Sequence, residues 1–168
     1  MNKNYTNKKN LNKNRAFNDE EILKLPNNLE AERAILGAIM LDNKLIDDAL
    51  HHLKPEDFHH PYNATIFQAM KDLNNKKLDF DLIILDEELS RNPNKDKELD
   101  VAYIASLLDG AIRMTNIDSY IKIVKEKSKA KRAILRANEF LNLCLEDDHE
   151  VNNHIVNLLN DLSLIYRE

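Results

Sequence analysis

Hydrophobic residues recur at three- and four-residue intervals along most of this chain, a spacing that places them on one face of a helix. The clearest example lies in the stretch 25–43. Its apolar face is formed by Ile35, Leu36, Ile39 and Met40. Asn27 or Asn28 is positioned to cap this helix, and Glu30 lies three residues beyond Asn27, as a capping box requires. The pattern therefore predicts a well-formed helix in this stretch.

Shorter helical patterns follow up to residue 115, separated by proline residues or by polar loops. Their first residues are expected at Asn43, Pro55, Pro61, Asp79 or Asp81, and Ala102. The loops between them have lengths typical of helical bundles. Residues 25–115 are therefore predicted to form a compact globular bundle of five or six short helices around one core.

The pattern changes at residue 116, where a long helix begins. Its apolar stripe comprises Ile117, Tyr120, Ile121, Val124, Ala130, Ile134, Ala137, Leu141 and Cys144. A polar break at 146–150 separates it from a second helix with near-heptad spacing. Residues 116–168 are thus predicted to form a long antiparallel helical hairpin, which makes the fold class all-α. Two helices alone cannot bury both stripes fully, so the hairpin needs a third body, which is either its own globular domain or another subunit. The predicted subunit interface comprises Ile155, Leu158, Leu159, Leu162 and Ile165.

Glycine content limits the kinds of fold and site that the chain can form. Its 168 residues include only two glycines, Gly37 and Gly110. A phosphate-binding loop needs several glycines close together, and tight β-hairpins usually need them too. The composition therefore argues against a nucleotide site of that type and against a β-rich fold. No run of about 18 apolar residues is present, so no segment is expected to span a membrane.

The net charge of −5 argues against general binding to nucleic acid through a basic field. Residues 1–24 are the exception, because they begin with a stretch rich in asparagine and lysine and free of acids. They are predicted to form a disordered basic tail. The lysines on the long helix are interspersed with acids, and we interpret them as a solvated face.

Residues capable of catalysis or metal binding are few. Four histidines lie close together in the sequence, His51, His52, His59 and His60. Adjacent histidines cannot easily direct two imidazoles at one ion, so structural roles are favoured over a metal site. Asp57 beside His59 or His60 suggests an acid–base pair but has no accompanying nucleophile. Cys144, the single cysteine, falls in an apolar helical run and is interpreted as a structural thiol. No catalytic, cofactor-binding or metal-binding residue is predicted.

An ordered set of motifs resembles a known family. The chain reads Pro-x-Asn-x-Glu-Ala-Glu from residue 26 and Ala-Ile-Leu-Gly-Ala from residue 34. Further matching segments are 53–58, 66–69, 81–82, 102–104, 116–117, 120 and 123–124. In this order and spacing they resemble the amino-terminal domain of the DnaB family of replicative DNA helicases. The resemblance extends from Pro26 to the end of the chain, but the Gly-Gly pair common in the family is replaced at 98–101 by Glu-Leu-Asp-Val.

The resemblance implies a role in DNA replication in the cytoplasm. In this family the domain forms a collar that supports the hexamer, in which hairpins pair two subunits and three such pairs close the ring. The collar also receives primase. Carried over to this chain, the implied primase contacts are Glu30, Tyr103, Ile134 and Phe140. Expected partners are further copies of the chain and primase, with a helicase loader as a further candidate and with little or no DNA contact.

The family's ATP-dependent motor, which carries a glycine-rich nucleotide loop, is not present in this sequence. The resemblance therefore implies that this domain has no catalysis or cofactor of its own, and that ATP and magnesium belong to the motor. The alternative hypothesis is an unrelated all-helical adaptor or regulatory protein that contacts nucleic acid through its basic tail.

Overall fold

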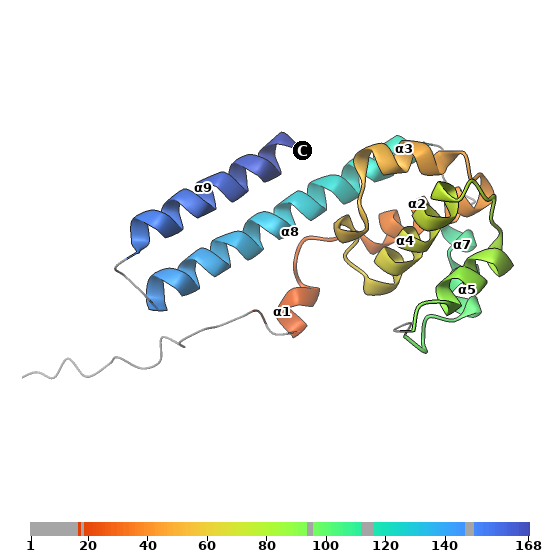
Figure 1. The fold of residues 1–168 in the computed structure, drawn as a ribbon, viewed down its shortest axis with the longest axis horizontal. Helices are drawn as coiled ribbons and strands as arrows, with labels where there is room; N and C mark the ends of the chain where they lie inside the picture. The colour runs from red at the N-terminus through yellow and green to blue at the C-terminus, as the bar shows by residue number, and fades with distance from the viewer. Residues whose placement is uncertain (1–16, 18, 94–95, 112–115, 147–149) are drawn as a thin grey trace, which may run out of the picture. The chain divides into compact units, whose positions relative to one another are not determined.

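The computed structural model describes residues 17, 19–93, 96–111, 116–146 and 150–168, and their regular secondary structure is entirely helical (Figure 1). The α-helices are α1 (Asp19–Leu23), α2 (Leu29–Leu41), α3 (Leu45–His52), α4 (Pro61–Asn75), α5 (Leu82–Ser90), α6 (Val101–Ser106), α7 (Leu108–Ala111), α8 (Ile117–Glu146) and α9 (Val151–Arg167). A short 3-10 helix, η1, spans Pro55–Asp57. The predicted all-α fold is confirmed.

The chain divides into two compact units. One is a globular unit, Pro26–Ala130, and the other combines Met1–Leu25 with the hairpin residues Lys131–Glu168. Helix α8 therefore contributes its first part to the globular unit and its second part to the hairpin. The sequence analysis placed this boundary at residue 116, where α8 begins. The structure shifts it by more than three turns because Ile117, Ile121 and Val124 are buried in the core of the globular unit.

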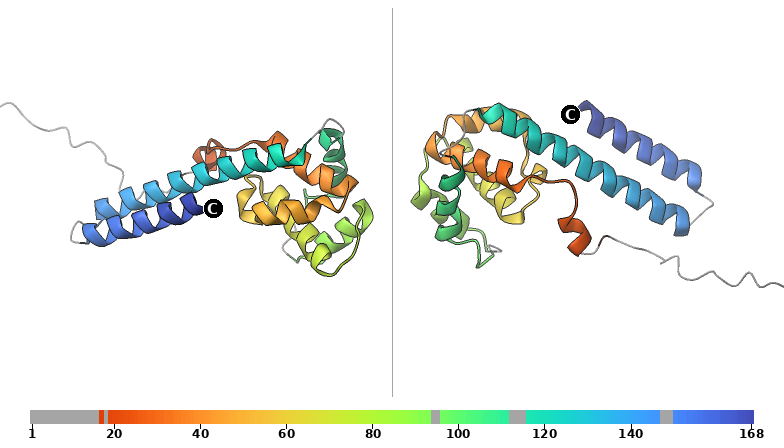
Figure 2. Two further views of the ribbon diagram at one scale, coloured as in Figure 1. Left: turned by 90° about the horizontal axis from the view of Figure 1, so that it is seen from above. Right: turned by 180° about the vertical axis from the view of Figure 1, so that it is seen from behind.

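Helix α2 is central to the globular unit. Eight of its thirteen residues are buried, and it packs against α3, α4 and α7 (Figures 1 and 2). The core around it is aliphatic with two phenylalanines in contact, Phe58 and Phe67, whose ring centroids are 4.8 Å apart. Burial of this apolar surface supplies the main driving force for folding.

Side-chain caps define where several helices begin. The Asn28 side chain accepts a hydrogen bond from the backbone N–H of Ala31 at 3.0 Å, so Asn28 rather than Asn27 caps α2. Asp81 and Asp100 cap α5 and α6 in the same way. Each cap satisfies backbone donors that have no partner inside the helix.

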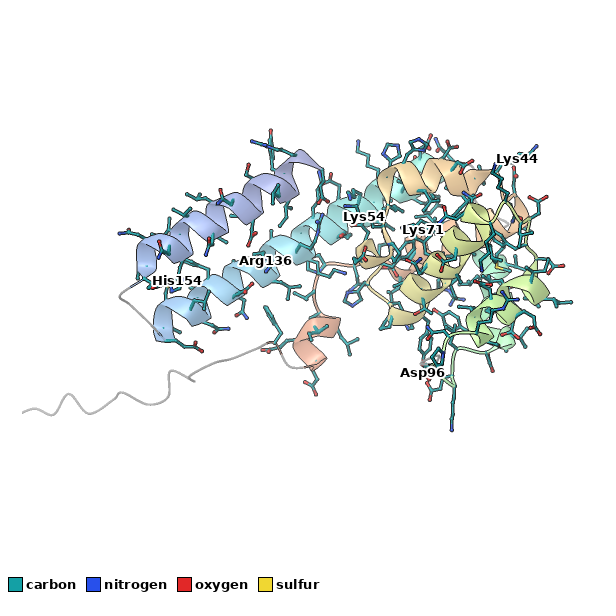
Figure 3. All side chains as sticks on the ribbon, viewed as in Figure 1. Lys44, Lys54, Lys71, Asp96, Arg136 and His154 are labelled. Atoms are coloured by element: carbon teal, nitrogen blue, oxygen red, sulfur yellow. The ribbon has the colours of Figure 1, made fainter. Side chains whose placement is uncertain are left out.

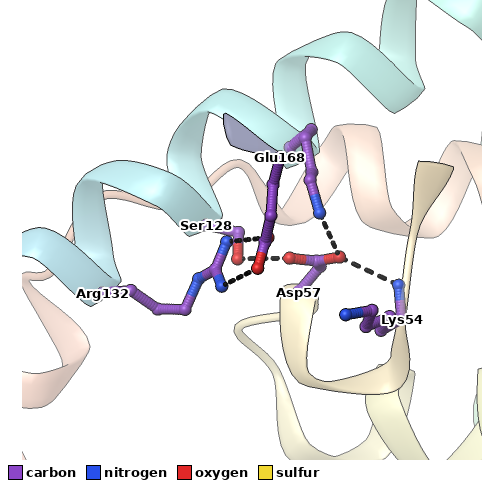
Figure 4. Close-up of polar contacts among 6 residues, drawn as sticks. Lys54, Asp57, Ser128, Arg132 and Glu168 are labelled. Atoms are coloured by element: carbon purple, nitrogen blue, oxygen red, sulfur yellow. Dashed lines mark hydrogen bonds and ion pairs between the residues drawn. The ribbon is translucent and has the colours of Figure 1, made fainter. Parts of the chain in front are cut away.

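The hairpin consists of the second part of α8 and all of α9, which lie side by side and run in opposite directions (Figures 1 and 2). Arg132 forms two hydrogen bonds with the carboxylate of Glu168 (Figure 4). Further along, Arg136 Nε lies 3.6 Å from Asp161 Oδ2. None of the residues of α9 is buried. The predicted hairpin is present, and the described residues leave much of its apolar surface uncovered.

Part of the predicted disordered tail is helical. Helix α1 lies within residues 1–24. Just after the helix, the backbone N–H of Lys24 donates a hydrogen bond to the carbonyl of Glu21. Glu20 and Glu21 fall in its first turn, where acidic side chains favour helix formation. The asparagine- and lysine-rich stretch 1–16 lies outside the described residues. None of the described helices combines the length and hydropathy needed to cross a lipid bilayer.

Candidate interaction surfaces

A buried carboxylate organises one side of the globular unit. Glu32 on α2 is 1% exposed and accepts hydrogen bonds from the backbone N–H groups of His59 and His60 at 2.7 and 3.2 Å. It also accepts one from Asn63 Nδ2 at 2.9 Å. Asn63 Oδ1 in turn accepts from the hydroxyl of Tyr103 at 2.8 Å. Glu32 thus links α2 to the start of α4 and, through Asn63, to α6.

Three aromatic rings lie beside this network and contact one another. The centroid of His60 lies 4.9 Å from that of Tyr62 and 5.8 Å from that of Tyr103, and the two tyrosine rings are 5.3 Å apart, edge to face. The guanidinium of Arg33 lies 5.5 Å from the centroid of Tyr103 and donates to the carbonyl and hydroxyl of Ser106. All three rings are partly exposed. We call His60, Tyr62 and Tyr103 the aromatic platform.

Carboxylates border this platform on the segment that leads into α6. The hydroxyl of Tyr62 donates to Glu98 Oε2 at 3.3 Å. Desolvation raises the pKa of Tyr62 to about 12. Hydrogen bonds to Asp96 and Glu98, and the negative charges of these two side chains, act in the same direction. Desolvation also raises the pKa of Tyr103, against the lowering effect of the Arg33 charge. The Tyr62 hydroxyl therefore lies beside acidic side chains.

Alkaline titration should reveal this environment directly. In a titration followed by tyrosinate absorbance, we expect Tyr62 to ionise near pH 12, later than an ordinary tyrosine with a pKa of about 10. The folded state then holds a proton that the unfolded state has lost, so stability should fall as pH rises from about 10 to 12. The Tyr62→Phe variant should lose the contribution of Tyr62 to the late absorbance change, while Tyr103, whose pKa is also raised, still contributes. A titration curve that is unchanged above pH 11 would contradict the assignment.

A second buried carboxylate holds α8 to the globular unit. Asp57 accepts hydrogen bonds from the Ser128 hydroxyl at 2.6 Å and from the backbone N–H of Lys54 at 2.9 Å (Figure 4). Lys125 Nζ lies 3.2 Å from Asp57 Oδ2. Asp57 and Ser128 are both buried. We call Asp57, Lys125 and Ser128 the α8 latch.

The hairpin carries two grooves between its helices, of about 440 and 410 Å³. Both are lined by Arg136, Glu139 and Asp161, so this charged group separates them. Arg136 Nη1 donates to Glu139 at 2.7 Å, and this hydrogen bond raises the pKa of the guanidinium. Figure 3 shows Arg136 and His154 on the two facing helices. The Nε2 atom of His154 is enclosed and has no hydrogen-bond partner in the described part of the chain.

Helix α8 also has an apolar stripe that takes no part in these grooves. Ile134, Leu141 and Leu145 recur at seven- and four-residue intervals, which places them on one face. Their exposed fractions are 39%, 58% and 58%, whereas the grooves are lined from α8 by residues such as Leu135 and Phe140. An apolar stripe left open in this way is typical of an interaction surface.

The histidines considered as metal ligands make local contacts instead. His51 Nδ1 lies 2.6 Å from the carbonyl oxygen of Asp47, and His60 Nδ1 accepts from the backbone N–H of Tyr62 as the cap of α4. Across the described residues, the structure brings no three histidine, cysteine, aspartate or glutamate side chains together as a metal site would require.

Comparison with known proteins assigns the family. Residues 24–126 match the model of the DnaB-like helicase N terminal domain, which is more than half of the chain. This chain belongs to the DnaB-like helicase N-terminal domain family. The match is to one domain of a helicase, and the family prediction is confirmed. The hypothesis of an unrelated helical adaptor is not supported.

Relatives of this DnaB-like domain are longer proteins. The replicative DNA helicase DnaB of Buchnera aphidicola is 34% identical over 139 residues, which cover 83% of this chain and 30% of that protein. DnaB of Geobacillus stearothermophilus is 34% identical over 112 residues, 67% of this chain and 25% of that protein. The chain therefore spans less than a third of the length of these relatives.

Solved structures share the fold. The N-terminal domain of DnaB helicase from Mycobacterium tuberculosis superposes with a TM-score of 0.75 at 24% identity, covering 83% of this chain and 99% of that one. The corresponding Helicobacter pylori domain, whose structure was described with its interactions with primase, gives a TM-score of 0.61 at 20% identity, covering 74% and 95%. At this level of identity the likeness establishes the fold.

The four predicted primase contacts of the DnaB-like domain are divided between its two units, with Glu30 and Tyr103 in the globular unit and Ile134 and Phe140 in the hairpin. Glu30 is exposed on α2, and Tyr103 belongs to the aromatic platform. Ile134 lies on the open stripe of α8, while Phe140 is partly enclosed in a groove beside Leu158. Their role as primase contacts stays a prediction.

The predicted subunit interface divides into two sets. Ile155 and Leu159 are 40% and 61% exposed, whereas Leu158, Leu162 and Ile165 are partly buried in the hairpin. Leu158 and Ile165 line the grooves against α8. Ile155 and Leu159 are therefore the members of this set most available to a second chain.

Sequence reasoning missed the buried, structural roles of Glu32 and Asp57 and the contacts of Tyr62. Glu32 occurs among the apolar positions of α2, four residues after the cap and three before Ile35. A charged residue on the buried face of an amphipathic helix indicates a specific partner, and this signal was available in the sequence. Nothing comparable marks Asp57, whose partners Lys125 and Ser128 lie about 70 residues further along the chain.

Proposed function

We propose that this domain is the amino-terminal collar of a hexameric replicative DNA helicase, in which it pairs subunits and docks primase. In this role it holds neither nucleotide nor metal and performs no catalysis. ATP and magnesium act in the remaining part of the helicase, since the chain spans only 30% of the Buchnera relative. Weak or absent DNA contact follows from the net charge of −5. A helicase loader is a further candidate partner.

The exposure of α9 is the observation that carries the pairing proposal. Not one residue of this 17-residue helix is buried, although its sequence has a heptad-like apolar stripe. A second hairpin packed on this surface would cover the stripe.

Light scattering across a concentration series tests the pairing. Leu159 and Leu41 are both 61% exposed, and Leu41 lies at the end of α2 in the globular unit. We expect the parent chain and the Leu41→Glu control to form dimers or larger assemblies. Leu159→Glu should raise the dissociation constant by at least about a hundredfold, because a two-fold interface contains the substituted position twice.

Primase docking is measured in the same instrument. The parent chain mixed with primase from the same organism should give the summed mass of a complex. A parent chain that stays monomeric at high concentration would refute the pairing, and the absence of a mixed complex would refute the docking.

A further inference from the structure

One ring of the aromatic platform is in contact with a cationic side chain of the same chain. The guanidinium of Arg33 lies over Tyr103 at 5.5 Å, a geometry in which a cation is attracted by the π-electrons of the ring. Arg33 is fixed there by its two hydrogen bonds to Ser106. Among the described residues, no cation lies over the ring of Tyr62, and this side chain is partly exposed.

Carboxylates lie close to the hydroxyl of Tyr62. Asp96, labelled in Figure 3, and Glu98 lie on the segment between α5 and α6, and both are exposed. Glu98 Oε2 is hydrogen-bonded to the Tyr62 hydroxyl, and the backbone N–H of Glu98 donates to Asp96 Oδ1 at 2.9 Å. Lys97, which lies between the two carboxylates in the sequence, is also exposed. The two carboxylates are thus held beside one ring by local hydrogen bonds.

We propose that Tyr62, Asp96 and Glu98 form a site for a lysine or arginine side chain of a partner protein. The cation would pack on the ring and donate charge-assisted hydrogen bonds to the carboxylates. Phosphate groups are disfavoured because the carboxylates repel them, which excludes nucleic acid as the ligand. A purely apolar side chain would remove the carboxylates from water without compensation.

This inference rests on the proposed function, because it assigns the chemistry by which the globular unit docks primase. The site adjoins Tyr103, one of the predicted primase contacts, and the rings of Tyr62 and Tyr103 are in edge-to-face contact. The primase segment that docks here is expected to present a basic side chain beside apolar residues. The negative charge of Asp96 and Glu98 would also accelerate its approach at low salt.

Calorimetric titration of the full chain with primase from the same organism tests the site. We expect Glu98→Gln to weaken binding by roughly fivefold and the double variant Tyr62→Leu with Glu98→Gln by more than about tenfold. The double variant should also bind with a weaker salt dependence. Tyr62→Phe keeps the ring and should stay within about twofold of the parent. Asp79→Asn, which removes an exposed carboxylate elsewhere on the globular unit, is the charge-matched control.

Failure of this inference is distinguishable from failure of the proposed function. If primase binds the parent and the double variant equally, the cation site is wrong while docking stands. If primase does not bind the parent at all, docking itself is refuted, and the site is tested with a capped tri-arginine peptide. Shifts of the Tyr62 ring protons on adding this peptide, absent in Glu98→Gln, would support a cation site for another basic partner. No shift in the parent would overturn it.

Discussion

Replacing Asp57 with alanine is expected to lower the free energy of unfolding by roughly 3 kcal/mol, the cost typical of breaking a buried ion pair. The substitution leaves the Ser128 hydroxyl, the Lys54 backbone N–H and the Lys125 ammonium without the acceptor that they share. The side chains of Asp57 and Lys125 are 4% and 14% exposed, so water compensates only part of this loss.

Urea unfolding followed by circular dichroism measures the change, with Asp79→Ala as an exposed control of the same residue type. Ser128→Ala should cost less, about 1 kcal/mol, because Asp57 then keeps two of its three partners. Hydrogen exchange should show the extra opening in the first part of α8. If Asp57→Ala unfolds at the same urea concentration as Asp79→Ala, the α8 latch does not contribute to stability.

Periodicity predicted the hairpin helices but not which edge of each stripe is covered. On α9 the predicted stripe is wide enough that Leu158 and Ile165 line grooves against α8 while Leu159 stays open. On α8 the stripe that contains Ile134 and Leu141 lies outside those grooves. The helical repeat in a sequence indicates which apolar positions share a face. Which neighbouring element covers that face is determined by tertiary packing.

Polar contacts between distant segments could not be predicted from local pattern. The family resemblance placed Tyr103 among candidate site residues, yet its hydrogen bond to Asn63 and its contacts with His60 and Tyr62 join parts of the chain about 40 residues apart. Helix caps act on backbone groups only two or three residues away, so the sequence narrowed the cap of α5 to Asp79 or Asp81, and the structure selects Asp81. Asp100, which caps α6, was not predicted. The aromatic platform was found only in the folded structure.

Replacing Glu32 with alanine is expected to destabilise the domain by roughly 4 kcal/mol, because three buried donors lose their acceptor and each unsatisfied donor costs about 1–3 kcal/mol. These donors are the backbone N–H groups of His59 and His60 and the amide of Asn63. The carboxylate also faces the positive end of α4, so its negative charge contributes to the stability of that helix. Glu32→Gln should cost about half as much, since its carbonyl oxygen still accepts.

Glu30→Ala is the matched control, because Glu30 occupies the same helix two residues earlier and is exposed. Glu30→Ala should lower the free energy of unfolding by only about 0.5 kcal/mol, because it removes a favourable interaction with the helix dipole. Thermal and urea unfolding distinguish the three variants, and Glu32→Ala stability equal to that of Glu30→Ala would refute the network.

Glu32→Gln should also release Asn63 from its position, which loosens the Tyr103 hydroxyl and the aromatic platform. Primase affinity should then fall even though no residue of the cation site has changed, because the fold that positions Tyr62 and Tyr103 depends on this one buried carboxylate.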